Sequence, residues 1–218
     1  GHRVVQGAEL FTKTTLVTDE VIDEIENLKE LAPVHNHGHA LALWACKKTM
    51  PNIPQVVVFD TAFHQTIPQK AFMYGFPYED YEQYHVRKYG FHGTSHRFVT
   101  AKLAEVMGKD LKDLKVVSCH LGNGSSITAV KGGESIDTTM GFTPLDGVLM
   151  GTRCGAVDPS AVTYVAGKHG FHVADMDNYM NKKSGMLGIS GLSSDFRDIT
   201  AASEKGDARA TLAKDMLV

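Results

Sequence analysis

The hydrophobic pattern between residues 17 and 31 has the period of an amphipathic helix. Asp19 and Glu20 fall in its first turn, where acidic side chains complement the helix dipole, and Pro33 follows its end. The pattern therefore predicts a surface helix whose apolar positions are Val17, Val21, Ile22, Ile25, Leu28 and Leu31.

The run from Gln55 to Phe59 is short and apolar, as in a strand that is buried within a sheet. Asp60 follows directly, at the strand end where open α/β sheets usually present their chemistry. The break at residues 61–63 is the candidate domain boundary.

Two β-branched runs, residues 116–117 and 127–130, flank a glycine-rich turn and predict a hairpin. Gly122 and Gly124 let the backbone approach an anion closely, and the amide of Asn123 adds a polar donor. The turn is therefore a candidate phosphate loop. The alternative is an ordinary hairpin turn, for which Gly-Asn-Gly is also typical.

Helical spacing recurs along the rest of the chain. The stretch 94–107 ends at Gly108, and His92 would stand just before its first turn. Alternation of helices with short strands predicts an α/β protein. The other predicted helices are 40–50, 161–165, 176–182 and 208–218.

Composition narrows the class of protein. The chain has 218 residues, 43% of them apolar, which suffices for a globular core. A formal charge of -3 without long Lys/Arg runs gives no support to nucleic-acid binding. Three cysteines form no CxxC pair, so a reducing, cytoplasmic location is expected. No apolar run approaches the roughly 18 residues of a membrane span, and we expect no secretory leader, because the first residues are not a basic segment followed by an apolar one.

Three segments place an arginine or histidine beside glycines: residues 1–5, 90–96 and 150–155. Such groups can turn into a cleft and bind an anion. From the residues alone, an arginine beside a glycine is more often a member of a surface or structural ion pair, which applies to Arg3 and Arg153, and a histidine such as His92 is more often structural.

Together with residues 58–64, Val-Phe-Asp-Thr-Ala-Phe-His, these segments resemble the acetate kinase (acetokinase) family. The resemblance runs over nearly the whole chain. Further motif matches are residues 31–36, 140–145 and 181–185.

The resemblance implies a two-domain α/β fold of the actin, sugar kinase and Hsp70 class, which is ribonuclease H-like. Residues 1–60 would be the remainder of an N-terminal acetate-binding domain, and residues 61–218 the first part of a C-terminal nucleotide-binding domain. A central fragment of a longer chain is expected, with part of each domain. The family's first phosphate loop, its adenosine loop and a magnesium-associated glutamate find no match here.

The implied reaction is phosphoryl transfer from ATP to acetate, giving acetyl phosphate and ADP by direct in-line transfer. Magnesium or manganese would be held by ligands outside this chain, and the family is generally homodimeric. Arg3 matches a substrate-binding position, and Arg153 and His92 match groups that stabilise the transferring phosphoryl. The phosphate loop matches His120, Leu121, Gly122, Asn123 and Gly124.

Asp60 matches a position often described as an acid or base. A carboxylic acid is already ionised at neutral pH, so the acceptor needs no base. We therefore expect Asp60 to orient an arginine or a magnesium-bound water; the alternative is a cap for the next helix. His35 matches another active-site histidine, and the matching alkyl-pocket residues are Val5, Val34, Phe91 and Pro144.

Two segments depart from the family pattern. Gln6-Gly7-Ala8 replaces a His and two glycines, and Ala8 would be strained if the backbone there needs a positive φ. His35, His37 and His39 lie at spacing two in an expected loop; a zinc site is disfavoured because no fourth ligand is near. Two alternatives stay open: a propionate or butyrate kinase, and a catalytically incomplete fragment that only binds phosphate or a sister chain.

Overall fold

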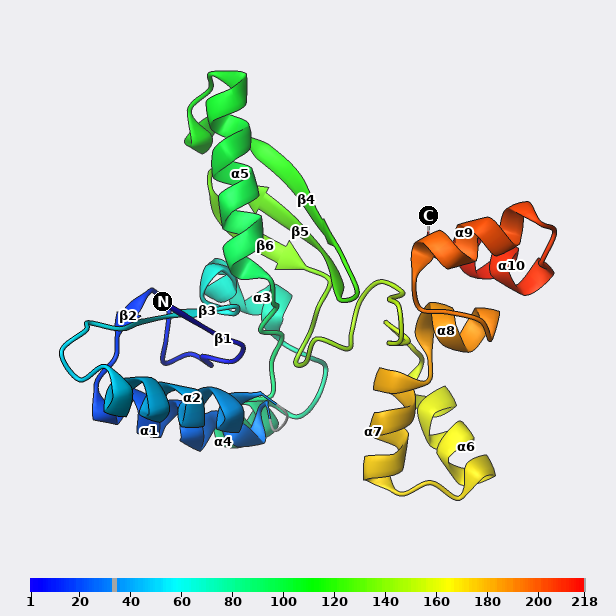
Figure 1. The fold of residues 1–218 in the computed structure, drawn as a ribbon, viewed down its shortest axis with the longest axis horizontal. Helices are drawn as coiled ribbons and strands as arrows, with labels where there is room; N and C mark the ends of the chain where they lie inside the picture. The colour runs from blue at the N-terminus through cyan, green and yellow to red at the C-terminus, as the bar shows by residue number, and fades with distance from the viewer. Residues whose placement is uncertain (33–34, 218) are drawn as a thin grey trace. The chain divides into compact units, whose positions relative to one another are not determined.

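The structure, a computed structural model, describes residues 1–32 and 35–217. The chain forms two compact units (Figure 1). Unit 1 contains residues 1–118 and 128–138, and unit 2 contains residues 119–127 and 139–218. The predicted division between residues 60 and 61 concerns functional domains and stays a prediction.

The first sheet of unit 1 has the strand order β1-β3-β2, with β1 at His2–Val4, β2 at Thr15–Leu16 and β3 at Val56–Phe59. The buried strand predicted at 55–59 is thus the central one. β1 lies parallel to β3, with Arg3 opposite Val58, while β2 is antiparallel. Parallel pairing brings the carboxyl ends of β1 and β3 to one edge of the sheet.

Helices α1, Asp19–Asn27, and α2, Asn36–Thr49, pack on each other beside this sheet (Figure 1). The helix predicted at 17–31 is confirmed as α1 followed by a 3₁₀ turn, Leu28–Glu30. The Thr18 hydroxyl accepts a hydrogen bond from the Val21 N–H and caps α1. The core formed by the helices and the sheet contains Val4, Phe11, Ile22, Ile25, Ala40, Leu43, Val57 and Phe59.

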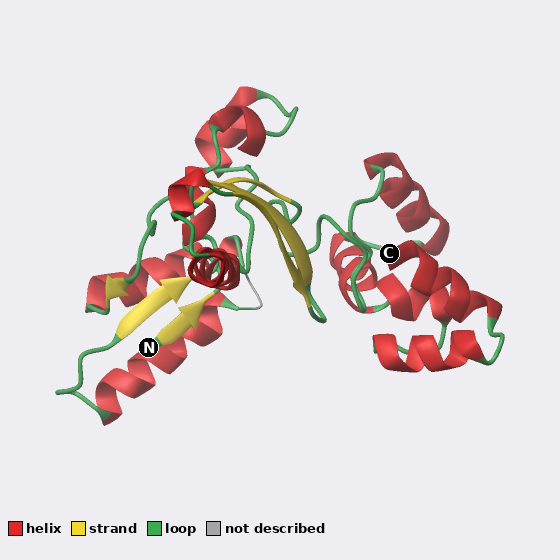
Figure 2. Ribbon diagram, turned by 90° about the horizontal axis from the view of Figure 1, so that it is seen from above, coloured by secondary structure: helices red, strands yellow, loops and turns green. Residues whose placement is uncertain are grey.

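A second sheet, seen as the long curved strands in Figure 2, has the order β4-β5-β6. The predicted hairpin is confirmed as β4, Lys115–Leu121, and β5, Ser125–Lys131. The third strand, β6 at Glu134–Thr138, escaped prediction because its five residues, ESIDT, contain one large apolar side chain.

The predicted helix at 94–107 is confirmed as α5, Gly93–Met107, which ends at Gly108 in the left-handed conformation (φ 61°). Shorter elements complete unit 1: η2 at Ala62–Thr66, α3 at Gln69–Phe72, α4 at Tyr78–Tyr84 and η3 at Leu111–Asp113.

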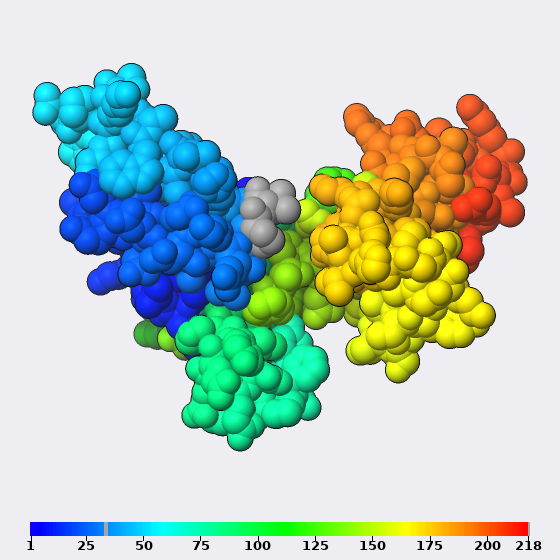
Figure 3. All heavy atoms as spheres, turned by 90° about the horizontal axis from the view of Figure 1, so that it is seen from below, coloured from blue at the N-terminus to red at the C-terminus, as the bar shows by residue number. Residues whose placement is uncertain are grey.

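Helices dominate unit 2. The stretches predicted at 161–165, 176–182 and 208–218 correspond to α6, α7 and α10, while α8 and α9 were missed. Helices α6 and α7 (yellow in Figure 3) are joined by a short turn, where the ring of Phe171 stacks on that of His169, the last residue of α6, with centroids 4.8 Å apart. The helix bounds are Pro159–His169, Val173–Lys182, Gly185–Ser190, Phe196–Glu204 and Ala208–Leu217.

In the part of the chain that the structure describes, no helix is both long and apolar enough to span a membrane.

Candidate functional site

Arg3 and Asp60 form a bidentate ion pair at the carboxyl edge of the first sheet. Arg3 Nε donates to Asp60 Oδ1 at 2.9 Å, and a terminal guanidinium nitrogen donates to Oδ2 at 2.5 Å. The Asp60 side chain is 4% exposed and that of Arg3 is 62% exposed. The hydrogen bonds to Asp60 and the attraction of its charge raise the pKa of Arg3 against the opposing effect of burial. A buried carboxylate therefore fixes an arginine whose head group still faces solvent.

His92 is held beside the same aspartate by its neighbour in the chain. The Gly93 N–H donates to the Asp60 carbonyl at 2.9 Å, and a Cβ at Gly93 would lie 2.4 Å from that oxygen. His92 itself has φ 57°, a left-handed conformation that costs a non-glycine residue about 1 kcal/mol. As predicted, it immediately precedes helix α5, as the N-cap. Asp60 thus connects Arg3 through its side chain with His92 through its backbone.

The histidine-rich segment at 35–39 lies mostly in a helix, because α2 begins at Asn36. The prediction that it is a loop was wrong, since three histidines and a glycine masked the helical period. His37 is exposed and pairs with Glu26 at 3.0 Å. Burial, followed by the charges of His35 and Arg3, lowers the pKa of His39. His35 and His39, with rings 6.4 Å apart, thus contribute to the electrostatic environment of the Arg3 site.

At residues 6–8, where the sequence departs from the family pattern, the backbone strain expected at Ala8 is found. Ala8 is buried and has a positive φ of 47°. Gln6 is fully buried; its Oε1 accepts from the Ala8 N–H at 2.9 Å, and its backbone exchanges hydrogen bonds with the Asn36 amide. Its Nε2 has no hydrogen-bond partner in the described chain. The loop after β1 therefore carries both backbone strain and an unsatisfied donor.

The predicted alkyl-pocket residues have different settings. Val5 and Phe91 are buried in unit 1, and Pro144 is half-buried in unit 2. Val34 lies outside the described residues.

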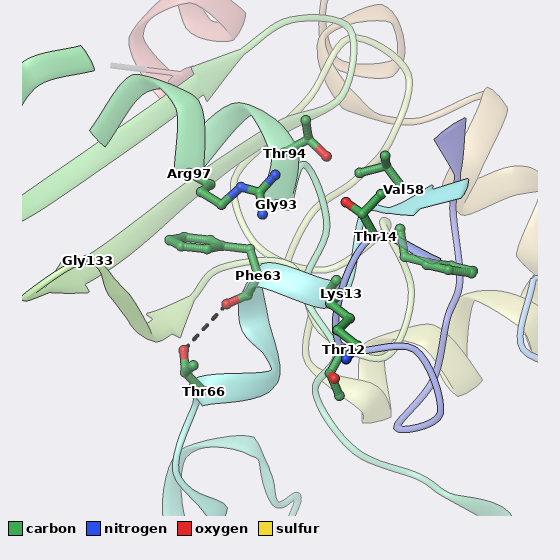
Figure 4. A pocket seen from close by; sticks show the side chains of 12 residues that line it. Thr12, Lys13, Thr14, Val58, Phe63, Thr66, Gly93, Thr94, Arg97 and Gly133 are labelled. Carbon is green, nitrogen blue, oxygen red and sulfur yellow. Dashed lines mark hydrogen bonds between the residues drawn. The ribbon is translucent and has the colours of Figure 1, made fainter. Parts of the chain in front are cut away.

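A separate cavity of about 200 Å³ in unit 1 opens beside the start of α5 (Figure 4). Arg97, Thr94 and Gly93 line one side, and Lys13 belongs to the opposite loop. Among the described residues no ion-pair partner is found for Arg97 or Lys13.

The predicted phosphate loop borders a cavity of about 700 Å³ in unit 2. Leu121, Gly122 and Asn123 line this cavity; His120 lies in β4, and the Gly124 carbonyl accepts from the Gly122 N–H at 3.2 Å. Gly151 lies against the loop, since a Cβ there would be 2.6 Å from the Asn123 side-chain oxygen. The loop is therefore attached to a pocket of nucleoside size rather than to open surface.

Another part of the lining of this cavity was not predicted. Ser194, Asp195 and Phe196 line it, together with Met150 and Met186. Asp195 caps α9 by accepting from the Arg197 N–H at 2.9 Å, and the Arg197 side chain lowers the pKa of Asp195 to about 2. The run Ser-Ser-Asp-Phe has the form of a helix start, which could have revealed the element but not its proximity to residue 123.

Arg153 has a different environment from Arg3. One guanidinium nitrogen donates to the Pro144 carbonyl at 3.1 Å and lies 3.9 Å from the Met150 sulfur. No carboxylate pairs with it in the described residues, and burial lowers its pKa. Two predicted residues, Arg153 and Pro144, are thus in direct contact. The charge of this arginine is available to an anionic ligand.

The described residues offer no cluster of three or more His, Cys, Asp or Glu side chains that could hold a metal ion. Cys46, Cys119 and Cys154 are all free thiols.

Solved structures define the class of protein. The chain superposes on the crystal structure of Porphyromonas gingivalis acetate kinase with a TM-score of 0.95 and 45% identity, covering 99% of this chain and 54% of that one. It superposes equally on a propionate kinase from Francisella tularensis subsp. tularensis SCHU S4, with a TM-score of 0.95, 45% identity and coverage of 100% and 56%. The fold is therefore that of the actin, sugar kinase and Hsp70 class.

Sequence comparison defines the family. Residues 1–218 match the Acetokinase family, so the chain belongs to it. "Acetate kinase 2" of Clostridium perfringens (strain 13 / Type A) is 57% identical over 216 residues, which are 99% of this chain and 54% of that protein. Acetate kinase of Bacillus cytotoxicus is 56% identical over 218 residues, 100% and 55% of the two chains. The chain spans about half the length of these relatives.

Proposed function

We propose that the protein containing this chain transfers the γ-phosphoryl group of ATP to acetate, giving acetyl phosphate and ADP by direct in-line displacement. Family membership supports this reaction. The observation that carries it is an exposed arginine, Arg3, fixed by the buried carboxylate of Asp60 beside the left-handed His92. Such a constellation fits an anionic acceptor.

On the acid side, Arg3 binds the substrate carboxylate, because a guanidinium fork matches its planar geometry. Asp60 orients Arg3 through two hydrogen bonds and removes no proton. No base is required because a carboxylic acid is ionised at neutral pH. Residues 1–60 accordingly belong to the acid-binding domain and residues 61–218 to the nucleotide-binding domain.

On the phosphoryl side, Arg153 and His92 stabilise the charge that spreads over the equatorial oxygens. Arg153 suits this role because its charge is not neutralised by a carboxylate of the described chain. Residues 120–124 hold the phosphates of ATP, and the adjoining cavity with Phe196 holds the nucleoside. Arg153, His92 and residues 120–124 therefore all act on anionic groups, and none of them needs to form a covalent intermediate.

A second candidate substrate is propionate, since the Francisella neighbour is a propionate kinase of equal structural similarity. Val5, Val34, Phe91 and Pro144 would select the length of the alkyl group. A single methylene changes binding by only about 1 to 3 kcal/mol, so both acids can be turned over.

Magnesium or manganese would accompany ATP and would be held by ligands outside this chain, so no step is assigned to the metal. The proposal also includes a homodimer in the cytoplasm, as inferred from the family, with acetate and ATP or ADP as the small-molecule partners.

The test is steady-state kinetics of the full-length gene product with ATP, magnesium and acetate, propionate or butyrate, followed by release of ADP. We expect kcat/KM to be highest for acetate and lower by about 10-fold or more for butyrate. A preference for propionate would transfer the proposal to the second candidate. No turnover of any of the three acids would contradict the reaction class.

A further inference from the structure

His64 is a fully buried histidine that the reaction does not use directly. It lies in η2, the turn that follows Asp60, and its side chain is 0% exposed. Burial lowers its pKa to about 4, so the ring is neutral at physiological pH. A buried neutral histidine with both nitrogens engaged is a rigid connection between the groups that it binds.

The two ring nitrogens connect distant parts of unit 1. Nε2 lies 2.8 Å from the Phe91 carbonyl oxygen, and Nδ1 lies 2.9 Å from the Ser135 hydroxyl. A carbonyl can only accept, so Nε2 carries the proton and Nδ1 accepts from Ser135. Ser135 is itself fully buried in β6, where its carbonyl accepts from the Thr66 hydroxyl at 2.8 Å. The tautomer of His64 is therefore determined by its two partners.

The Phe91 carbonyl belongs to the peptide bond that precedes His92. On the other side of His92, the Gly93 N–H donates to the Asp60 carbonyl. The left-handed residue is thus held by one hydrogen bond before it and one after it, both to the segment 60–64. Gly90, with φ 72°, permits this arrangement, since a Cβ there would be 2.8 Å from the His64 ring. Strained conformations persist only where the surroundings determine them in this way.

We propose that His64 is a positioning residue for His92: through the Phe91 carbonyl it fixes the backbone from which His92 reaches the transferring phosphoryl group. His64 itself touches no substrate. The inference rests on the proposed function, because it gives His92 its role in phosphoryl transfer.

The test compares His64→Leu, which removes the donor, with His64→Gln, whose amide nitrogen can replace Nε2. In the full-length protein we expect His64→Leu to lower kcat by about 10- to 100-fold, with the KM of acetate changed less than about threefold. His64→Gln should recover kcat to within about threefold of the unmodified protein. Should His64→Leu fail to fold, Ser135→Ala, which removes only the donor to Nδ1, should lower kcat by about three- to tenfold.

His96→Leu is the matched control. His96 is also 0% exposed, and its Nδ1 lies 2.9 Å from the Ser118 hydroxyl, at a ring distance of 5.9 Å from His64. His96→Leu should lower Tm as much as His64→Leu does, while its kcat should stay within about twofold of that of the unmodified protein. An equal loss of kcat in both leucine variants would show a general packing effect and overturn the proposal.

Two further readouts separate positioning from stability. In a His92→Ala background, His64→Leu should lower kcat less than about threefold further, because the two residues act as a unit; a full additional loss would overturn the proposal.

Crystal structures of the two His64 variants should show His92 displaced in the leucine variant and retained in the glutamine variant. Unchanged His92 in both would also overturn it. This structural comparison is independent of activity, whereas failure of the proposed function would appear as an unmodified protein without turnover.

Discussion

Two arginines that look alike in sequence occupy opposite electrostatic environments. Arg3 pairs with a buried carboxylate in unit 1, and its pKa is raised. Arg153 in unit 2 binds a carbonyl and a thioether sulfur, and burial lowers its pKa. The structural ion pair that remained an alternative for both arginines is found for Arg3, whereas among the described residues none is found for Arg153.

The two environments suit two different roles: Arg3 is held in a fixed orientation, whereas Arg153 keeps its full charge. Asp60 neutralises part of the charge on Arg3 and fixes its geometry, so Arg3 suits a ligand that must be aligned. Arg153 keeps a charge that the described chain does not compensate, so it gains most when negative charge develops nearby. The variants below test this distinction, in order of decreasing effect.

Arg153→Ala should cause the largest loss. An arginine that stabilises phosphoryl transfer contributes about 10³-fold or more to kcat, and we expect a loss of that order with little change in the KM of acetate. The measurement is initial velocity at saturating ATP.

Arg209→Ala is the matched control for Arg153. Arg209 donates to the backbone carbonyls of Ile189 at 2.7 Å and Gly188 at 3.1 Å, and, as for Arg153, no carboxylate among the described residues pairs with it. Its removal should leave kcat within about twofold of the unmodified protein. Similar losses from the two variants would mean that Arg153 is structural.

Asp60→Asn should lower kcat/KM for acetate by about 100-fold, because Arg3 loses a charged partner and its alignment. His92 should stay in place, since it is held by the Asp60 backbone carbonyl. Adding Arg3→Ala to this variant should then cost less than about threefold more. Fully additive losses would show that the two residues do not act as one unit.

The buried His64 should make the stability of unit 1 pH-dependent. Its folded pKa of about 4 lies below the ordinary 6.5, so between these values the unfolded state binds more protons and stability falls with acidification. Between pH 7 and pH 5 we expect the wild-type chain to lose about 2 kcal/mol of unfolding free energy through this residue. Urea denaturation at pH 7 and pH 5 measures this loss of unfolding free energy. In His64→Gln the loss should be smaller by the same amount of about 2 kcal/mol, because glutamine does not titrate. Identical pH dependence in both proteins would contradict the assignment.

The smallest effect is expected in the loop after β1. Ala8→Gly should raise the unfolding free energy by about 1 kcal/mol, because Ala8 has φ 47° and glycine carries no penalty there. Gly7→Ala is the opposite test: a Cβ at this position would lie 2.8 Å from the Phe59 ring, so the variant should be destabilised. Denaturant titration measures both. A stability loss for Ala8→Gly would show that the methyl group contributes more by packing than it costs in strain.

The sequence predicted the parts of the site that depend on neighbours along the chain. The apolar run before Asp60 identified the central strand, and Gly108 identified the end of α5. The strain at Ala8 was indicated by the resemblance to acetate kinases, in which a glycine stands at this position. Each of these features is determined within a few residues.

Contacts between distant segments could not be predicted in this way. Ser135 is 71 residues from His64 in sequence, and β6, which places Ser135, lacks a clear apolar alternation. The cavity wall at Ser194–Phe196 faces a loop some 70 residues earlier in the chain, and the spacing of neither segment encodes that contact. Sequence pattern identifies elements, while their pairing depends on packing.

The central claim is tested most directly by trapping the acyl phosphate. The full-length protein and the 218-residue chain would each be given ATP, magnesium, acetate and hydroxylamine, with Arg153→Ala of each as control. We predict acetyl hydroxamate from the full-length protein well above its control, and none above control from the 218-residue chain. Absence of hydroxamate from the full-length protein, or an equal amount from Arg153→Ala, would contradict the account.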